Sequence, residues 1–144
     1  MNTTIDLFLD FTPCDLYRLG NSSSPKLDAV RTSPPRAKDE RVDIESYTGP
    51  DGAQWIDAKT GGVSLFDQRI IRMGRQWYRL PANTQIPTGL VISKDAGAAA
   101  PGDAVHYTVR PVKNMPLAHY IALLRMLIPF AQPAFFGIAL PTPK

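Results

Sequence analysis

The stretch TGGVSLFD, residues 60–67, places two adjacent glycines before a short apolar run that contains one serine, Ser64. Glycine adopts positive φ without steric cost, so the glycine pair indicates a tight turn leading into a strand. Successive side chains of a strand point to opposite faces, which puts Ser64 and Phe66 on one face and the two aliphatic residues on the other. A hydroxyl and a ring on one face suit the floor of a ligand site. The other interpretation is a buried strand whose serine bonds a neighbouring carbonyl, and these eight residues alone favour it.

Length and composition indicate one domain, residues 1–144, with a net charge of +3 and a single cysteine, Cys14. One cysteine excludes an internal disulfide framework and fits a reducing compartment. The mild basic excess does not require a nucleic-acid partner. The first ten residues lack the basic leader of a secretory signal, and prolines 129, 133 and 141 interrupt the best candidate for a membrane span. We therefore expect a soluble, cytoplasmic protein.

Strands outnumber helices in the expected structure. Apolar alternation and turn residues predict strands at 15–19, 46–47, 53–58, 60–66, 90–92 and 105–112. One helix is indicated by the apolar stripe over 117–128, with Asn114 as its cap, Pro116 in its first turn and Pro129 limiting its end. Residues 22–43 form a proline-rich loop and residues 131–144 an apolar tail.

Several familiar kinds of site are not supported by the sequence. His106 and His119 are thirteen residues apart and no cysteine pair accompanies them, so the spacing of a zinc site is missing and we expect no metal. The serine-hydrolase elbow G-x-S-x-G does not occur around Ser64. Neither a phosphate-binding P-loop nor a dinucleotide G-x-G-x-x-G is present.

Two stretches leave alternatives open. RIIRMGRQWYR, residues 69–79, carries four arginines with Trp77 and Tyr78, a combination that clamps phosphates and stacks bases. The same residues fit a hairpin with one solvated arginine face and one packed face, which we favour. The tail in 131–144 either covers an exposed part of the core or forms a patch for a partner protein.

The order of three motifs carries a family resemblance. LYR near Leu16–Gly20, GGVSLF on a middle strand and HYTVRPVKNMP leading into the helix resemble the toxin family typified by the type VI secretion-exported effector 2. The resemblance covers residues 16–20 and most of 60–130, including the phrase IPTGLV at 86–91. It implies an α+β, β-rich ADP-ribosyltransferase-like fold of two small packed sheets with few helices. It also implies a glycosyltransferase-type activity on NAD.

Residue roles follow from this resemblance. Arg18 stands where the family's arginine binds the NAD phosphates, and Ser64 fits the residue that holds the nicotinamide ribose. His106 is a polar contact or a proton carrier, although a half-buried strand histidine with a satisfied ring explains it equally well. The expected cofactor-binding set also includes Tyr17, Gly62, Phe66 and Tyr107.

The catalytic glutamate of such enzymes is the missing component. It is expected on the HYTV strand, where Thr108 stands, and no acid lies between Asp103 and the end of the chain. Asp67 and Asp103 are the nearest alternatives. Whether the chain is an active enzyme is therefore left open.

The resemblance implies an intracellular toxin that binds NAD and modifies a cytosolic macromolecule, with an immunity protein as a possible partner. The alternative is a non-enzymatic domain on the same scaffold. It would hold a protein or a nucleic acid through the apolar tail and the arginine-rich hairpin.

Overall fold

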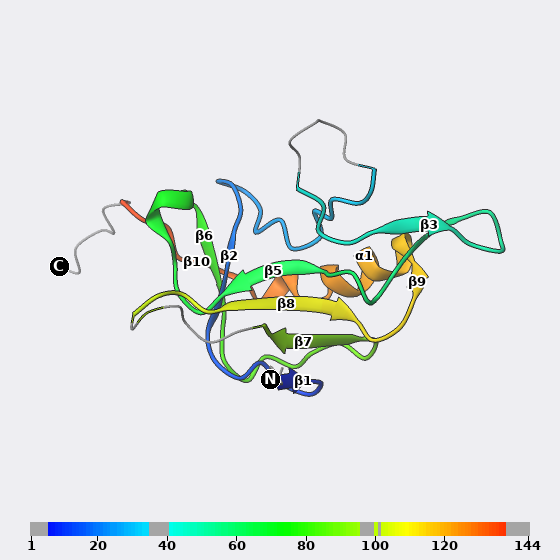
Figure 1. Ribbon diagram of the computed structural model, residues 1–144. Helices are drawn as coiled ribbons and strands as arrows, with labels where there is room; N and C mark the ends of the chain where they lie inside the picture. The colour runs from blue at the N-terminus through cyan, green and yellow to red at the C-terminus, as the bar shows by residue number, and fades with distance from the viewer. Residues whose placement is uncertain (1–5, 35–40, 96–99, 101, 138–144) are drawn as a thin grey trace.

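The computed structural model describes residues 6–34, 41–95, 100 and 102–137. The elements are β1 (Asp6–Phe8), β2 (Leu16–Leu19), β3 (Ser46–Thr48), β4 (Gln54–Ile56), β5 (Val63–Phe66), η1 (Ile71–Met73), β6 (Trp77–Leu80), β7 (Leu90–Lys94), β8 (His106–Pro111), β9 (Met115–Pro116), α1 (Leu117–Arg125), η2 (Ile128–Phe130) and β10 (Gln132–Pro133). The described strands form two antiparallel sheets accompanied by one α-helix (Figure 1). The predicted α+β, β-rich class is confirmed.

The larger sheet has the strand order β1-β7-β8-β5-β2-β6-β10, and the smaller one has the order β3-β4-β9. Within the larger sheet, β2 pairs with β5 only through Tyr17 opposite Phe66 among the described residues, whereas β2 and β6 pair over four residues. In Figure 1, β2 and β6 run across the direction of β5, β8 and β7. The sheet therefore changes direction at β2, next to the strand that carries Ser64.

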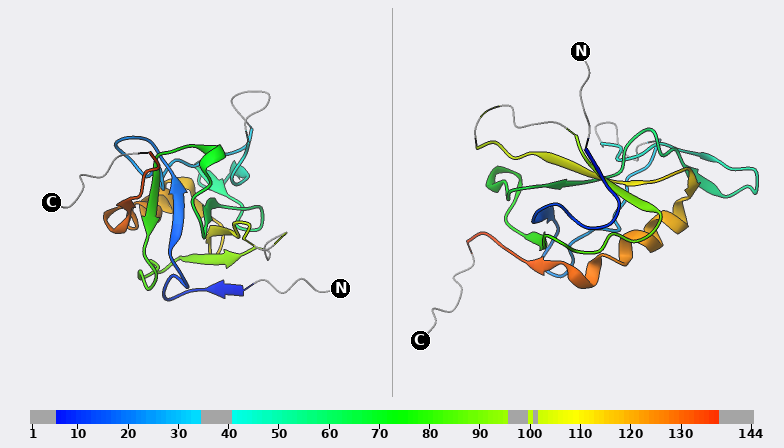
Figure 2. Two further views of the ribbon diagram at one scale, coloured as in Figure 1. Left: turned by 90° about the vertical axis from the view of Figure 1, so that its left-hand side faces the viewer. Right: turned by 90° about the horizontal axis from the view of Figure 1, so that it is seen from below.

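Helix α1 covers one face of β5 and β8. The fully buried Tyr120 reaches between these strands, where its hydroxyl accepts a hydrogen bond from Val63 N (3.1 Å) and donates one to Val109 O (2.6 Å). Leu123 and Leu124 join Val63, Val109 and other buried residues in one apolar core. Figure 2 shows α1 along one side of the larger sheet, so the opposite face of β5 and β8 is free of the helix.

The predicted hairpin at residues 69–79 is wrong. Its first half forms the 3₁₀ turn η1, in which Ile71 and Met73 are 56% and 43% exposed. Its second half is β6, which pairs with β2 and β10 instead of with the first half. A short apolar run forms a strand only where a partner strand is available, and the first half has none among the described strands.

The helix ends also differ from the prediction. Asn114 does not cap α1, because its side chain accepts a hydrogen bond from Ala58 N and donates one to the Tyr47 hydroxyl. Pro116 occupies the N-cap position, outside the first turn. The helix stops at Arg125, and the remaining apolar positions continue into η2.

The described part of the tail packs on the sheet. Residues 132–133 pair with β6, the Phe135 ring lies edge-on to Tyr78, and Arg69 stacks over Phe136 at 4.1 Å. Residues 138–144 lie outside the described residues, as do 35–40 of the proline-rich loop.

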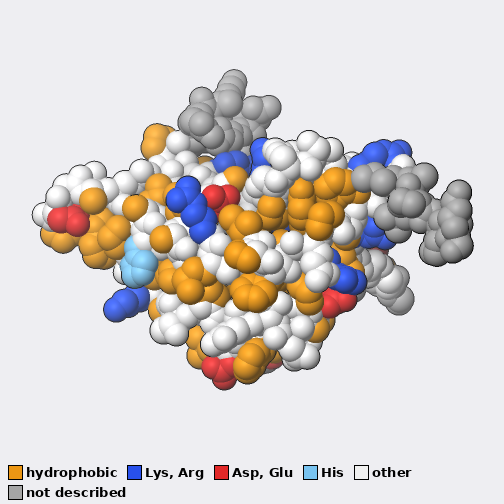
Figure 3. All heavy atoms as spheres, turned by 180° about the vertical axis from the view of Figure 1, so that it is seen from behind, with side chains coloured by type: hydrophobic (Ala, Val, Ile, Leu, Met, Phe, Trp, Pro, Cys, Tyr) orange, Lys and Arg blue, Asp and Glu red, His pale blue; other side chains and the backbone are white. Residues whose placement is uncertain are grey.

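The surface on the side of α1 carries exposed hydrophobic side chains in several separate areas, divided by polar and basic groups (Figure 3). At nine residues, α1 is too short to cross a bilayer, and none of the other helices in the described ranges has the length and apolarity to do so.

Candidate functional site

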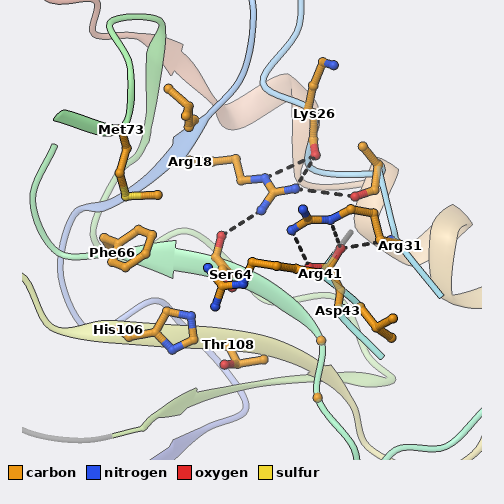
Figure 4. Close-up of a pocket in the computed structure, with 15 residues that line it drawn as sticks. Arg18, Lys26, Arg31, Arg41, Asp43, Ser64, Phe66, Met73, His106 and Thr108 are labelled. Atoms are coloured by element: carbon orange, nitrogen blue, oxygen red, sulfur yellow. Dashed lines mark hydrogen bonds and ion pairs between the residues drawn. The ribbon is translucent and has the colours of Figure 1, made fainter. Parts of the chain in front are cut away.

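A cavity of about 810 Å³ lies on the face of β5 and β8 that α1 leaves free (Figure 4). Its walls come from β2, from the proline-rich loop and from the two strands themselves. Five of the predicted site residues line it: Arg18, Gly62, Ser64, Phe66 and His106. Segments far apart in the chain thus bring most of the predicted site together.

The floor of the cavity is formed by β5. Val63 and Leu65 are fully buried toward the core, whereas Ser64 and Phe66 face the cavity, as the alternation predicts. The Ser64 hydroxyl has no hydrogen-bond partner among the described residues, so the interpretation in which it bonds a neighbouring carbonyl does not apply to this part of the structure. The Phe66 ring lies edge-on to the His106 ring, with centroids 5.2 Å apart.

Two glycines shape this floor for different reasons. Gly61 has φ of +151°, and a Cβ there would lie 2.2 Å from Asp43 O. A Cβ on Gly62 would lie 2.2 Å from Val109 O and 2.9 Å from Thr108 Cγ2. A side chain at position 62 would therefore force β5 away from β8.

Arg18 reaches from β2 into the cavity wall, where backbone carbonyls bind its guanidinium. Nη1 donates to Ser64 O (3.1 Å), Nε and Nη2 donate to Lys26 O (3.2 and 3.1 Å), and Nη2 also donates to Ala29 O (3.4 Å). Burial lowers the pKa of this guanidinium, while the charge of Asp43 acts in the opposite direction. Arg18 thus ties the proline-rich loop to β5 and places a positive charge beside Ser64.

The proline-rich loop supplies further cations to the cavity. Arg31 forms a bidentate ion pair with Asp43, whose side chain is only 4% exposed (Nη2–Oδ1 2.9 Å, Nε–Oδ2 3.2 Å). Arg41 and Lys26 also line the cavity and are exposed, and neither is ion-paired with a described residue. Sequence reasoning assigned the loop no site residues because its prolines and mixed charges resemble any solvated loop.

Two predicted aromatic contacts lie elsewhere. Tyr107 is 5% exposed and packs in the core, where its hydroxyl lies 3.8 Å from Cys14 Sγ and burial raises its pKa. Tyr17 precedes Arg18 on β2 and is not among the residues lining the cavity. Tyr17 precedes Arg18 and Tyr107 follows His106, and the alternation of a strand turns each tyrosine to the face opposite its cavity-lining neighbour.

The acids near the site differ in what they contact. Asp67 accepts a hydrogen bond from Val105 N (2.8 Å), and Asp103 lines a second cavity of about 480 Å³ that shares Phe66 and Met73 with the first. Asp95, just after β7, accepts from Thr108 Oγ1 (2.5 Å) and lies 2.6 Å from His106 Nδ1. No group of three or more His, Cys, Asp or Glu residues suited to a metal ion occurs in the described ranges.

Sequence reasoning missed Asp95 because the predicted strand stopped at residue 92. In the structure β7 continues for two more residues, so Lys94 pairs with Tyr107 and Asp95 lies beside His106. Antiparallel register, however, becomes known only when the partner strand is known.

Comparison with known proteins gives one family. A family model described as Tse2 ADP-ribosyltransferase toxin matches residues 14–129. The matched stretch runs from just before β2 into η2 and includes all the cavity-lining residues named above. No curated protein matches the chain.

Proposed function

The chain belongs to the Tse2 ADP-ribosyltransferase toxin family, and we propose that it binds NAD in the cavity and transfers the ADP-ribosyl group to a macromolecule in the cytoplasm of a cell. Family membership agrees with the resemblance inferred from the three ordered motifs. NAD binding, the cytoplasmic location and the target are parts of this proposal.

The convergence of Arg18 and Ser64 carries the proposal. These residues are 46 positions apart, and the Arg18 guanidinium contacts the Ser64 carbonyl while both line one cavity. Its volume of about 810 Å³ falls within the range of about 300–1,000 Å³ typical of small-molecule sites.

The side chains suggest an orientation for NAD. The diphosphate would lie toward the exposed Arg41, because arginine is a usual partner of phosphate oxygens. The nicotinamide ribose would bond the unpartnered Ser64 hydroxyl, and the nicotinamide ring would lie near Phe66. Arg18 retains its charge at the cavity wall, although most of its N–H groups already bind carbonyls.

The proposed reaction breaks the bond between the nicotinamide nitrogen and C1′ of the ribose. Nicotinamide leaves with the bonding electron pair, so positive charge develops on the ribose, and a nucleophile of the target then bonds to C1′. Groups that stabilise the developing charge accelerate such a step.

Titration calorimetry with NAD tests the binding site. We expect Arg41→Ala to weaken binding by about tenfold or more, and Ser64→Ala by about fivefold, from the usual value of a charged and a neutral hydrogen bond. Arg79→Ala is the matched control, because Arg79 is exposed, lies outside the cavity and bonds only Gln132 among the described side chains. Absence of binding heat for the wild type would refute the proposal, as would equal weakening by the control.

Expression in a susceptible cell distinguishes this function from the non-enzymatic alternative. Growth arrest that Ser64→Ala abolishes supports the cavity, whereas arrest abolished only by truncation after Phe130 supports binding through the tail. Of the four arginines in residues 69–79, Arg69 bonds the carbonyls of Ala134 and Phe135, and Arg79 bonds Gln132, so two of the four are already engaged within the protein. We also expect an immunity protein to suppress the arrest on co-expression.

A further inference from the structure

We propose that Asp95 takes the place of the missing carboxylate by holding His106 with its proton on Nδ1, so that Nε2 accepts the proton of the attacking nucleophile. This inference rests on the proposed function. Asp95 acts through His106, so it is a positioning residue, and His106 is the group that meets the reactants.

The carboxylate of Asp95 is surrounded by donors. Its Oδ2 lies 2.6 Å from His106 Nδ1 and accepts from Thr108 Oγ1 at 2.5 Å, and its Oδ1 accepts from Ser93 Oγ at 2.7 Å. Arg110 lies behind the group, with Nη2 3.6 Å from Oδ1 and Nε donating to Ser93 Oγ. The carboxylate oxygens therefore lie among the imidazole, two hydroxyls and a guanidinium, which fix their position beside the His106 ring.

The backbone fixes this arrangement. Ser93 pairs with Thr108 in the β7–β8 ladder, and the next hydrogen bond runs from Asp95 N to His106 O (3.0 Å). Asp95 is therefore anchored beside His106 at the end of the ladder. Thr108, which stands where the glutamate is expected, uses its hydroxyl to hold the Asp95 carboxylate.

An acceptor at Nδ1 selects one form of the neutral ring. Because the Asp95 carboxylate oxygen lies 2.6 Å from Nδ1 and can only accept, the neutral ring would carry its proton on Nδ1, which leaves the lone pair at Nε2. Phe66 contacts the ring edge-on and limits its rotation. The His106 side chain is 41% exposed and lines the cavity, and no described residue occupies Nε2.

This geometry gives a balanced transfer step. The bond from C1′ to the nicotinamide nitrogen breaks, and nicotinamide departs with its electron pair. The lone pair of the nucleophile forms the new bond to C1′, and the nucleophile's proton moves to His106 Nε2. The resulting imidazolium lies against the Asp95 carboxylate, which stabilises it before the proton passes to solvent.

Nitrogen NMR of ¹⁵N-histidine protein tests the positioning without NAD, at a pH where the ring is neutral. We expect the Nδ1–H form in the wild type and conversion to the ordinary Nε2–H form in Asp95→Ala. Asp67→Asn is the control, because the Asp67 carboxylate accepts a hydrogen bond from Val105 N, directly before β8, and does not contact the His106 ring. A wild-type ring already in the Nε2–H form, or one unchanged in Asp95→Ala, would overturn the proposal.

Nicotinamide release from NAD tests the catalytic consequence. We expect Asp95→Asn, which preserves the side-chain shape, to lower kcat by about 10²-fold with little change in KM, because the proton acceptor is affected and the NAD contacts are not. Equal loss in Asp67→Asn would overturn the assignment of Asp95. No release by the wild type would refute the transfer function and with it the proton-transfer role, while the NMR result would still decide whether Asp95 positions the ring.

Discussion

Replacing Arg18 with methionine tests its structural role in holding the proline-rich loop to β5. Methionine keeps most of the aliphatic stem and removes the guanidinium, so Lys26 O, Ala29 O and Ser64 O lose their donor. The contacts to the loop carbonyls are exposed and water replaces them at small cost, about 0.5 kcal/mol each. The contact to Ser64 O is partly buried and costs about 1.5 kcal/mol.

The expected loss in the free energy of unfolding is therefore about 3 kcal/mol. For a domain of this size the melting temperature falls by about 3–4 °C for each kcal/mol, so we expect a decrease of about 9–12 °C. Circular dichroism during heating, with urea titration for the free energy, measures both quantities.

Arg41→Met is the matched control. Arg41 lines the same cavity, but its side chain is exposed and is not ion-paired with a described residue, so its loss should change stability by less than about 0.5 kcal/mol. An Arg18→Met protein within about 0.5 kcal/mol of the wild type would refute the idea that the guanidinium holds the loop.

Three further predictions concern the packing around β5, β8 and α1. Gly62→Ala should lower the free energy of unfolding in urea by about 3 kcal/mol and disturb β5–β8 pairing, because its Cβ would lie 2.2 Å from Val109 O. Gly52→Ala is the control, because a Cβ there has nothing within 4 Å and only the backbone is strained. Equal spectral changes in the two variants would contradict the predicted clash at Gly62. Tyr120→Phe should cost about 3 kcal/mol by leaving Val63 N and Val109 O without a partner. Burial also raises the pKa of Tyr120 above its ordinary 10, so the tyrosine ionises in the unfolded chain before it ionises in the folded one. Wild-type stability should therefore fall as pH rises above 10, by up to about 1.4 kcal/mol per pH unit for this group. The fall should be shallower in Tyr120→Phe, which has no hydroxyl to ionise. Asn114→Ala should speed hydrogen exchange at Ala58 N and leave α1 unchanged, whereas faster exchange in the first turn of α1 would show that Asn114 caps the helix after all.

The side-chain periodicity of strands accounts for what the sequence predicted correctly. The period of two at Val63–Phe66 placed Ser64 and Phe66 on one face, and the same rule separates Arg18 from Tyr17 and His106 from Tyr107. Aromatic type alone predicts Tyr17 and Tyr107 as ligand contacts, whereas their strand faces turn both away from the cavity.

Other features depend on partners that a local pattern does not identify. RIIRM became η1 because β6 paired with β2 and β10, and Asn114 bonded Ala58 instead of capping α1. The position of Asp95 beside His106 depends on the register of β7 with β8, which residues 90–95 alone do not specify.

The order of strands in the larger sheet has a consequence for protein synthesis. Arg18 leaves the ribosome 88 residues before His106, and β2 lies between β5 and β6, which are both made later. At about 5–20 residues per second, the growing chain waits roughly 5–20 s before the last wall of the cavity is translated. A nascent chain therefore lacks a complete cavity until β8 has been translated and has paired with β5.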